Sequence, residues 1–303
     1  MTSATTDSST PGDVWKQWLL HRRNPGDEAK ALADEHFRKI REEVLDNANV
    51  QEGESVLDVG TGTGLVAIGA LERVGPKGRV IFSDISEDCL EHCSTFVESI
   101  AMRDRCEFVV AAIEDLSAIG DASVDVVTTR SVLIYSDEKQ RAFAEFFRVL
   151  RPGGRLSMFE PINRFASDGD TETFRGYDMA PVAELMARVR AAFNDHNPGQ
   201  NAAMVDFDER DLIRFGDEAG FQQVHLELKA HLIRGRRGDW DQFLNSSPNP
   251  LSLSLREAVD RALNEEERSA FTDYMKQTFE ATAIANRNAV AFLVAVKAGN
   301  VQH

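Results

Sequence analysis

Short apolar runs and amphipathic stretches alternate along the middle of the chain. Between residues 55 and 160 the apolar runs have the length of buried strands, and the stretches between them carry apolar residues at helical spacing. This pattern predicts, in order, strand 55–60, helix 64–74, strand 79–84, helix 86–102, strand 107–111, strand 124–129, helix 137–149 and strand 154–160. Because strands that alternate with helices imply right-handed crossovers, we expect a doubly wound α/β core with a mainly parallel sheet covered on both faces.

The rhythm changes after Pro161. A polar loop leads into 181–193, where apolar residues recur at helical spacing and predict an inserted cap. The α/β pattern resumes with a helix closed by Gly220 and a strand over 221–233, and a second insertion, 239–286, contains two further helical stretches. The final apolar run, AVAFLVAVKA, predicts a last buried strand.

These changes predict the division of the chain into parts. The expected parts are a disordered polar tail (1–12), N-terminal helices (13–50), an α/β core (51–160), a cap insertion (161–206) and the end of the core sheet (207–303) with the helical insertion 239–286.

Charge narrows the classes of function. The chain has 34 Lys and Arg against 50 Asp and Glu, a formal charge of −16, which repels phosphate backbones and anionic membrane surfaces. We therefore expect neither nucleic acid nor a membrane as a partner. No apolar run approaches the roughly 20 residues of a membrane span, and MTSATTDSSTPGD lacks the regions of a signal peptide. The prediction is a cytoplasmic protein.

The cysteines and acidic residues do not predict a metal site. Cys89, Cys93 and Cys106 form an odd set without a CxxC pair, which argues against a disulfide framework and against zinc. The sequence also lacks a dense set of Asp, Glu and His, so a magnesium-dependent mechanism is not expected.

The strongest chemical signal is the run VLDVGTGTG at 56–64, followed 20 positions after Gly64 by Asp84 at the end of the next strand. In a βαβ unit such glycines let the backbone approach a nucleoside cofactor, and the acidic residue meets its ribose hydroxyls. The spacing is GxGxG, whereas the dinucleotide fingerprint GxGxxG has its third glycine where this chain has Leu65. A phosphate-binding P-loop is excluded because no GKS or GKT follows.

Three motifs together resemble those of class I S-adenosylmethionine-dependent methyltransferases, near the type found in ubiquinone and menaquinone biosynthesis. They are VLDVGTGTG, Asp84 and FFRVLRPGGRL at 146–156, with DVVTTRSVLIY at 125–135 between them, and the similarity covers about residues 40–160. The resemblance implies a Rossmann-like, seven-stranded, mainly parallel sheet with an antiparallel last strand and helical caps. It also implies S-adenosylmethionine as cofactor and a small-molecule methyl acceptor as partner.

The resemblance assigns the glycine loop to the methionine end of the cofactor. Gly60, Thr61, Gly62 and Gly64 form the loop that would pass beside the methionine part, with Asp58 near its ammonium group. An alternative for Asp58 is a strand-end carboxylate that satisfies loop amides.

The ribose and adenine contacts follow at the next strand ends. Asp84 would accept both ribose hydroxyls, because a carboxylate has acceptors only. Its alternative is a cap for the helix that begins near Ser86. Ile85 would lie against the adenine, and Arg130 would contact the methionine part through its main chain, unless its side chain serves a surface ion pair.

The adenine pocket departs from the family pattern. Where the family often has D-A-x-x-L, with the acid bonded to the adenine amino group, this chain has Ala112-Ile113-Glu114-Asp115-Leu116. Ala112 cannot accept that bond. Either Glu114 or Asp115 substitutes, or the Ile113 amide alone reads the ring, and we expect Ile113 and Glu114 to line the pocket.

Methyl transfer depends on positioning and exclusion of water, and a base is not obligatory. The candidate catalytic residues at the strand ends are Tyr135 and Glu160, with Asn163 and Arg164 as further polar groups. Tyr135 could instead pack beneath the following helix, and Glu160 could anchor a loop by hydrogen bonds.

The acceptor is predicted only as a class. The caps contain Phe165, Phe174, Met179 and Trp240, which favours a partly hydrophobic or aromatic metabolite methylated on oxygen, nitrogen or carbon. Arsenic methylation is disfavoured because the three cysteines do not have the pattern expected for it. Two other functions stay open: an NAD-dependent oxidoreductase and a non-catalytic S-adenosylmethionine-binding protein. The oligomeric state also stays open, with a homodimer among the options.

Overall fold

The computed structural model describes residue 15 and residues 27–166, 172–196, 202–235 and 238–299. The predicted tail (1–12) lies outside these residues, as does most of the first part of the predicted N-terminal helices. The elements are, in order, α2 (Asp27–Asn47), β1 (Ser55–Val59), α3 (Leu65–Arg73), β2 (Arg79–Asp84), α4 (Glu87–Ser99), η2 (Arg103–Arg105), β3 (Cys106–Val110), β4 (Val124–Arg130), η3 (Leu133–Tyr135), α5 (Lys139–Val149), β5 (Leu150–Pro161), η4 (Asn163–Phe165), β6 (Thr173–Phe174), β7 (Tyr177–Asp178), η5 (Ala180–Val182), α6 (Ala183–His196), α8 (Glu209–Ala219), β8 (Gln223–Gly235), α9 (Trp240–Asn245), α10 (Leu255–Ala262), α11 (Glu265–Ala281) and β9 (Ile284–Val296).

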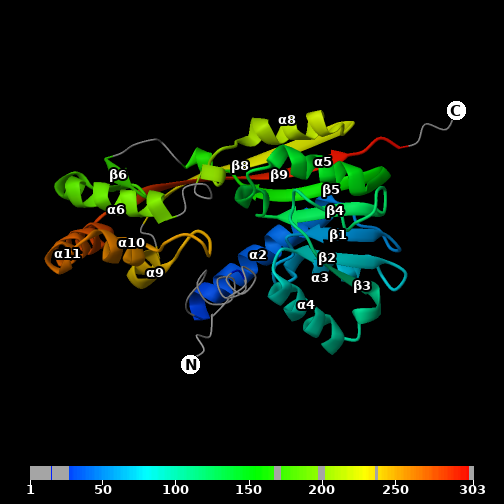
Figure 1. The fold of residues 1–303 in the computed structure, drawn as a ribbon, viewed down its shortest axis with the longest axis horizontal. Coiled ribbons are helices and arrows are strands. Elements are labelled where there is room, and N and C mark those ends of the chain that lie inside the picture. Colours follow the sequence, from blue (N-terminus) through cyan, green and yellow to red (C-terminus); the bar gives the residue numbers. More distant parts are fainter. Residues whose placement is uncertain (1–14, 16–26, 167–171, 197–201, 236–237, 300–303) are drawn as a thin grey trace, which may run out of the picture.

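Seven strands form one sheet in the order β3-β2-β1-β4-β5-β9-β8 (Figure 1). Strands β1 to β5 pair in parallel, and β9 runs antiparallel to both of its neighbours, β5 and β8. The predicted fold class is confirmed: a doubly wound, mainly parallel sheet whose last strand is antiparallel.

The register of the sheet sorts its apolar side chains into two cores. Leu57 pairs with Ile81 and Val127, and all three lie in the core that α5 and α8 cover. The preceding residue, Val56, pairs with Val80 and lies in the core under α2, α3 and α4. Because side chains alternate across a strand, successive β1 residues pack against the helices on opposite faces of the sheet.

The last strand, β9, is longer than the sequence pattern predicts, whereas β8 has the predicted length of 13 residues and begins and ends two residues later than predicted. β8 pairs with β9 over its whole length, from Gln223 opposite Val296 to Gly235 opposite Ile284, whereas β5 reaches only Val290 of β9. The segment of β9 before Val290 therefore forms a two-stranded arm with β8. β9 begins inside the predicted insertion 239–286, because pairing with β8 makes residues 284–288 extended although they are not a continuous apolar run.

The arm carries a helical cap at the end of the molecule opposite β1–β4 (Figure 1). Segments from both predicted insertions, α6 with β6 and β7 and then α9 to α11, share a third hydrophobic core. Its centre holds aromatic rings, with the Phe243 and Phe279 centroids 5.0 Å apart and those of Trp240 and Phe279 5.4 Å apart. Two insertions that are distant in sequence thus fold together; the division into domains stays a prediction.

Candidate functional site

A cavity of about 420 Å³ lies where β1, β2 and β4 end, the edge at which ligands of open α/β sheets bind. The predicted site residues that line it are Asp58, Gly60, Thr61, Gly62, Asp84, Ile85, Ile113, Glu114, Arg130 and Tyr135. Gly64 and Glu160 are not among the lining residues. The folded chain therefore brings most of the predicted positions to one concave surface.

The glycine loop makes a tight turn from β1 into α3. Gly60, Gly62 and Gly64 have φ values of 66°, 53° and 86°, in the left-handed region that favours glycine. Gly60 is also sterically constrained, because a Cβ there would lie 2.2 Å from Cγ2 of Val132. The Thr61 amide donates to the carbonyl oxygen of Ser83 in β2 (2.9 Å), which ties the turn to the neighbouring strand.

Asp84 links this turn to the start of α4. Its Oδ2 accepts a hydrogen bond from the Gly62 amide (2.8 Å), and its Oδ1 accepts one from the Ser86 amide (2.9 Å). Burial raises the pKa of the Asp84 carboxyl. The side chain that caps α4 is Ser86, which accepts from the Cys89 amide (3.1 Å). The Ile85 amide also bonds to this carboxylate, which has about four acceptor sites, so capacity remains for at least one hydroxyl hydrogen bond.

Asp58 lies beneath the loop, almost fully buried in β1. Its Oδ1 accepts from Oγ1 of Thr128 (2.7 Å), and its Oδ2 accepts from the Ala67 amide of α3 (3.2 Å). Burial raises the pKa of the Asp58 carboxyl to about 6. The carboxylate thus satisfies an amide in the first turn of α3, where the alternative considered from the sequence had expected loop amides, and it also lines the cavity.

Arg130 ends β4 at the cavity wall. Its guanidinium carbon lies 5.1 Å from the centre of the Phe37 ring of α2, a cation–π arrangement. Ser131 follows with φ of 56°, an uncommon conformation for a residue other than glycine. The chain therefore turns sharply at the point where the resemblance places a main-chain contact to the methionine part.

The segment after β3 supplies one acidic side chain to the cavity. Glu114 lines it and accepts a hydrogen bond from Oγ of Ser136 (3.0 Å). Ile113 is buried beside it, and Ile85, which follows the neighbouring strand β2, is 47% exposed. Asp115 is exposed, and its carboxylate accepts from the Ser117 amide (3.2 Å). Of the two acids that the sequence left open, Glu114 is the one at the cavity.

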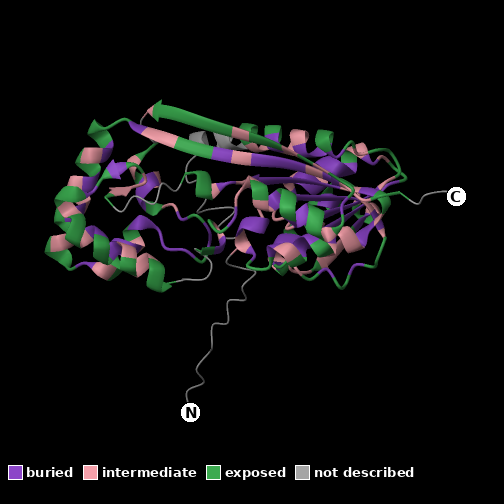
Figure 2. Ribbon diagram, turned by 90° about the horizontal axis from the view of Figure 1, so that it is seen from above, coloured by how far each residue is buried: buried purple, intermediate pink, exposed green. Residues whose placement is uncertain are grey.

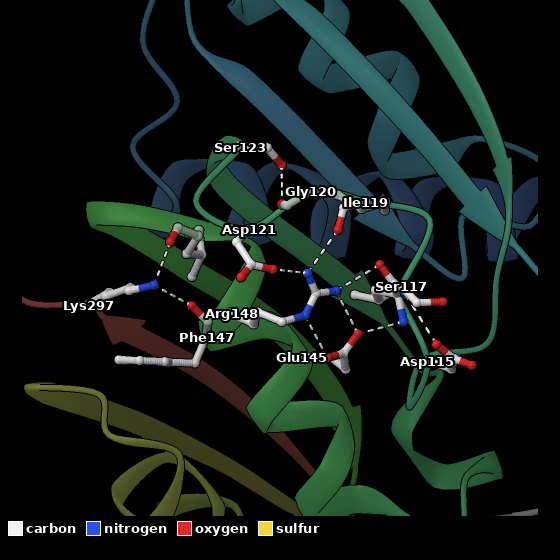
Figure 3. Close-up of polar contacts among 12 residues, drawn as sticks. Asp115, Ser117, Ile119, Gly120, Asp121, Ser123, Glu145, Phe147, Arg148 and Lys297 are labelled. Carbon is white, nitrogen blue, oxygen red and sulfur yellow. Dashed lines mark hydrogen bonds and ion pairs between the residues drawn. The ribbon is translucent and has the colours of Figure 1, made fainter.

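Arg148 on α5 fixes the loop that continues this segment (Figure 3). Its guanidinium group donates to Glu145 Oε1 and Oε2 (both 2.8 Å), to the carbonyl oxygens of Leu116 (2.8 Å) and Ile119 (2.9 Å) and to Asp121 (2.6 Å). Glu145 also accepts from the Leu116 amide (2.7 Å). Arg148, a residue of the third motif, therefore fixes the loop that follows Glu114.

Glu160 is fully buried at the end of β5 and faces the turn after β4. Its Oε1 accepts from the amides of Val132 and Leu133, both at 2.9 Å. Among the described residues Oε2 has no hydrogen-bond partner, and burial raises the pKa of this carboxyl to about 7. This geometry is that of the loop anchor, the alternative considered for Glu160; its catalytic role stays a prediction.

Tyr135 lies at the cavity rim between two other segments. Its ring packs edge to face on Trp15, with centroids 5.0 Å apart and an interplanar angle of 68°. Its hydroxyl donates to the carbonyl oxygen of Pro248, in the loop before α10, at 3.4 Å. Trp15 also lines the cavity. Asn163, by contrast, donates to Met204 (3.1 Å) and does not line it.

Sequence reasoning missed part of the wall. Val132, Ser136, Asp137 and Glu138 line the cavity and were not predicted. They follow β4, so the rule that ligands bind beyond the carboxyl ends of parallel strands could have found them. The cap residues that suggested an apolar acceptor do not line the cavity: Phe165, Phe174, Met179 and Trp240.

The cysteines are buried. Cys93 packs against the glycine loop, with its Sγ 3.4 Å from the Gly62 carbonyl oxygen, and burial raises its pKa well above the ordinary range. Cys89 lines the cavity, and burial also raises the pKa of Cys106. Within the described part of the chain, no group of three or more His, Cys, Asp or Glu is arranged to hold a metal. No helix in that part is long and apolar enough to cross a bilayer.

Comparison with known proteins gives consistent matches. The sequence profile of the ubiE/COQ5 methyltransferase family matches residues 30–231. An arsenite methyltransferase from Halobacterium salinarum is 37% identical over 196 residues, which are 64% of this chain and 44% of the relative, so the match spans less than half of that protein. The ubiquinone/menaquinone biosynthesis C-methyltransferase UbiE from Cronobacter sakazakii is 27% identical over 202 residues, 64% of this chain and 77% of the relative.

Solved structures share the fold. A geranyl diphosphate methyltransferase in complex with SAM has a TM-score of 0.51 at 17% identity, with 90% of this chain and 92% of that chain covered. CrArsM, an arsenic(III) S-adenosylmethionine methyltransferase from Chlamydomonas reinhardtii, has a TM-score of 0.50 at 21% identity, with 84% of this chain and 66% of that chain covered.

Proposed function

The chain belongs to the ubiE/COQ5 methyltransferase family, and on this premise we propose that it transfers the methyl group of S-adenosylmethionine to a small metabolite. The predicted family and the predicted cofactor are confirmed by the family match and by the homologous methyltransferases. The acceptor, the attacking atom and the roles of individual residues are proposals, as is the predicted cytoplasmic location.

One observation carries the proposal: Asp84 and Gly62 are joined by a 2.8 Å hydrogen bond at the wall of the cavity. This bond orients a carboxylate with spare acceptor capacity beside a loop in which a side chain at Gly60 would clash. The ribose and the methionine part of the cofactor fit this wall of the cavity. The ribose offers two hydroxyl donors to the carboxylate, and the loop lets its backbone lie close to the methionine part. The shorter GxGxG spacing disfavours NAD.

The residues of the chain then have separate tasks. Asp84 holds the ribose, Ile85, Ile113 and Glu114 bound the adenine, and the Gly60–Gly64 loop with Asp58 and Arg130 receives the methionine part. The bound cofactor supplies a methyl group activated by its sulfonium. The protein contributes by aligning the acceptor and by excluding water, which can account for much of the rate of such a displacement.

The acceptor contacts are assigned to the Trp15–Tyr135 side of the cavity. The two aromatic rings support a partly hydrophobic or aromatic acceptor, and the Tyr135 hydroxyl is the protein group proposed to assist removal of a proton. Arsenite, the acceptor named for the halobacterial relative, is not adopted as the acceptor of this chain. Only one of the three buried cysteines, Cys89, lines the cavity, and burial raises the pKa of Cys93 and Cys106.

Binding measurements test the cofactor site first. Calorimetric titration with S-adenosylhomocysteine and with NADH should give saturable binding of the former only. Asp84→Asn should weaken S-adenosylhomocysteine binding by at least about tenfold, because an amide nitrogen replaces one acceptor oxygen. Glu91→Gln, on the exposed surface of α4, removes the same charge outside the cavity and serves as control. If both variants bound S-adenosylhomocysteine with equal affinity, Asp84 would not contact the cofactor.

Activity is tested with S-adenosylmethionine carrying a tritiated methyl group. Incubation with pools of small metabolites should transfer label to an extractable product, and arsenite in a separate reaction should remain unlabelled. Binding of the cofactor with no labelled product in any pool would support the non-catalytic alternative. Labelled arsenite would overturn the assignment made from the cysteines.

A further inference from the structure

The outer edge of the sheet has the features of a surface that pairs with itself. β8 is the terminal strand, 13 residues long, and the described residues place no strand beside its outer side. Figure 2 shows it along the border of the molecule, mostly exposed. Leu228, Leu232 and Ile233 are 37%, 54% and 60% exposed. Long edge strands with exposed apolar side chains are templates for pairing with another strand.

Hydrogen bonds at the two ends of the β5–β9 pairing show which peptide groups of β8 face outward. The Ile162 amide donates to Ala289 (2.8 Å), and the Lys297 amide donates to Gly154 of β5 (2.9 Å). Since successive residues point to opposite sides of a strand, odd-numbered residues of β9 face β5. Leu228 is in register with Ala291, so its N–H and C=O point away from β9. The same holds for every even-numbered residue of β8.

The sequence of β8 is self-complementary about Leu228. When an identical strand runs antiparallel with Leu228 opposite Leu228, Glu227 lies opposite Lys229 and Leu226 lies opposite Ala230. Each of these pairs occurs twice because of the two-fold axis. Even-numbered residues then face even-numbered residues, which is the condition for their outward N–H and C=O groups to bond. Within its own chain Lys229 already forms ion pairs with Glu43 of α2 and, at 3.7 Å, with Glu227. In this register the partner's Glu227 joins that charge network while the backbone groups are matched.

Neighbouring registers are less favourable. A two-fold axis at Lys229 brings this lysine opposite its own copy, and like charges directly opposite destabilise a sheet. The other edge strand, β3, has only five residues, Cys106–Val110, and an axis at Phe108 would place Glu107 opposite Val109. The chain as a whole carries −16, so two copies repel over most of their surface, whereas β8 contains one acidic residue, Glu227, with Lys229 and Arg234.

We propose that this chain forms a two-fold symmetric homodimer in which the β8 strands pair antiparallel about Leu228 and join the two sheets into one. Any antiparallel strand could bond to these backbone groups; the partner is a second copy because its own sequence also supplies a matched charge pair and matched apolar side chains in the same register. The cavity lies beyond β1, β2 and β4, so the inference does not depend on the methyl acceptor.

Disulfide trapping tests the register. Leu228→Cys should form an intermolecular disulfide on mild oxidation, because directly opposite residues have Cα atoms about 5.5 Å apart. Glu227→Cys alone and Lys229→Cys alone should not cross-link, but an equimolar mixture should, because each faces the other. The native cysteines are buried, which keeps the background low. Val110→Cys, 53% exposed on the opposite edge, is the matched control and should not cross-link.

Dissociation tests the energetics. Wild-type protein should sediment as a dimer, and Leu228→Glu, which brings two carboxylates together on the axis, should raise the dimer dissociation constant at least about tenfold. An unchanged melting temperature and unchanged S-adenosylhomocysteine binding would show that the variant folds. A monomeric wild type, or a dimer in which Leu228→Cys does not cross-link while Val110→Cys does, would overturn the proposal.

Discussion

Gly60 and Val132 touch so closely that a Cβ on Gly60 would lie 2.2 Å from Cγ2 of Val132 and 2.7 Å from its Cγ1. This contact joins the loop after β1 to the turn after β4, two walls of the same cavity. Glu160 holds the second wall in place through the Val132 and Leu133 amides. The glycine at position 60 is therefore required by packing between the walls as well as by its φ of 66°.

Gly60→Ala should lower both stability and cofactor affinity. The new methyl group must displace Val132 and the backbone must hold a left-handed conformation, which together cost about 2–4 kcal/mol. Thermal unfolding and calorimetric titration with S-adenosylhomocysteine measure the two effects. Gly53→Ala is the control, because Gly53 has φ of 89° and a Cβ added there would meet no atom within 4 Å, so only the backbone cost applies. Equal effects in both variants would contradict the packing argument.

Glu160 should make stability depend on pH. Burial raises the pKa of Glu160 to about 7 in the folded state, whereas its pKa in the unfolded state is near 4.5. The protonated carboxyl therefore adds to the free energy of unfolding fully below pH 4.5, and this stabilisation is lost as the pH rises through 7. Glu160→Gln keeps an oxygen acceptor for the two amides and does not ionise. Its stability relative to wild type should therefore rise between pH 4.5 and 7, by on the order of 3 kcal/mol.

Urea unfolding across that pH range measures the difference between Glu160→Gln and wild type. Asp58 contributes in the same direction, with a pKa raised to about 6, but it is present in both proteins and cancels. The exposed variant Glu91→Gln should follow the wild-type profile. A difference between Glu160→Gln and wild type that does not change with pH would refute the prediction.

Arg148→Lys should loosen the adenine segment. A lysine cannot reproduce the five contacts of the guanidinium group with Glu145, Asp121 and two carbonyl oxygens, so we expect a loss of about 2 kcal/mol of stability. Hydrogen exchange should increase at residues 112–121. Arg151→Lys is the control, since Arg151 forms an ion pair only with Asp125 among the contacts described. Unchanged exchange in Arg148→Lys would show that the loop is held by other contacts.

Tyr135→Phe tests whether the hydroxyl of Tyr135 takes part in catalysis or whether its ring only packs against the cavity wall. If the hydroxyl assists proton removal, kcat should fall by about 100-fold while the dissociation constant of S-adenosylhomocysteine stays the same. The ring contact with Trp15 is preserved in this variant, so packing is not disturbed. A kcat within a factor of about two of wild type would leave Tyr135 as a wall residue.

The local features of the cofactor site could be predicted because they depend on neighbours in sequence. The glycines follow β1 directly, Asp84 ends β2 and Arg130 ends β4, and parallel strands present their carboxyl ends at one edge. Choosing between alternatives needed coordinates. That Ser86, not Asp84, caps α4, and that Glu114, not Asp115, faces the cavity, depends on the side-chain directions at two turns.

The pattern of apolar residues determined the order of strands and helices by itself, because burial on both faces of a parallel sheet requires short apolar segments between amphipathic helices. The tertiary structure alone decided the long-range contacts. It placed Glu160 beside the Val132 amide, packed two distant insertions into one cap and made β8 and β9 pair beyond the end of β5. These contacts join residues far apart in the chain, and no local pattern encodes which of them meet.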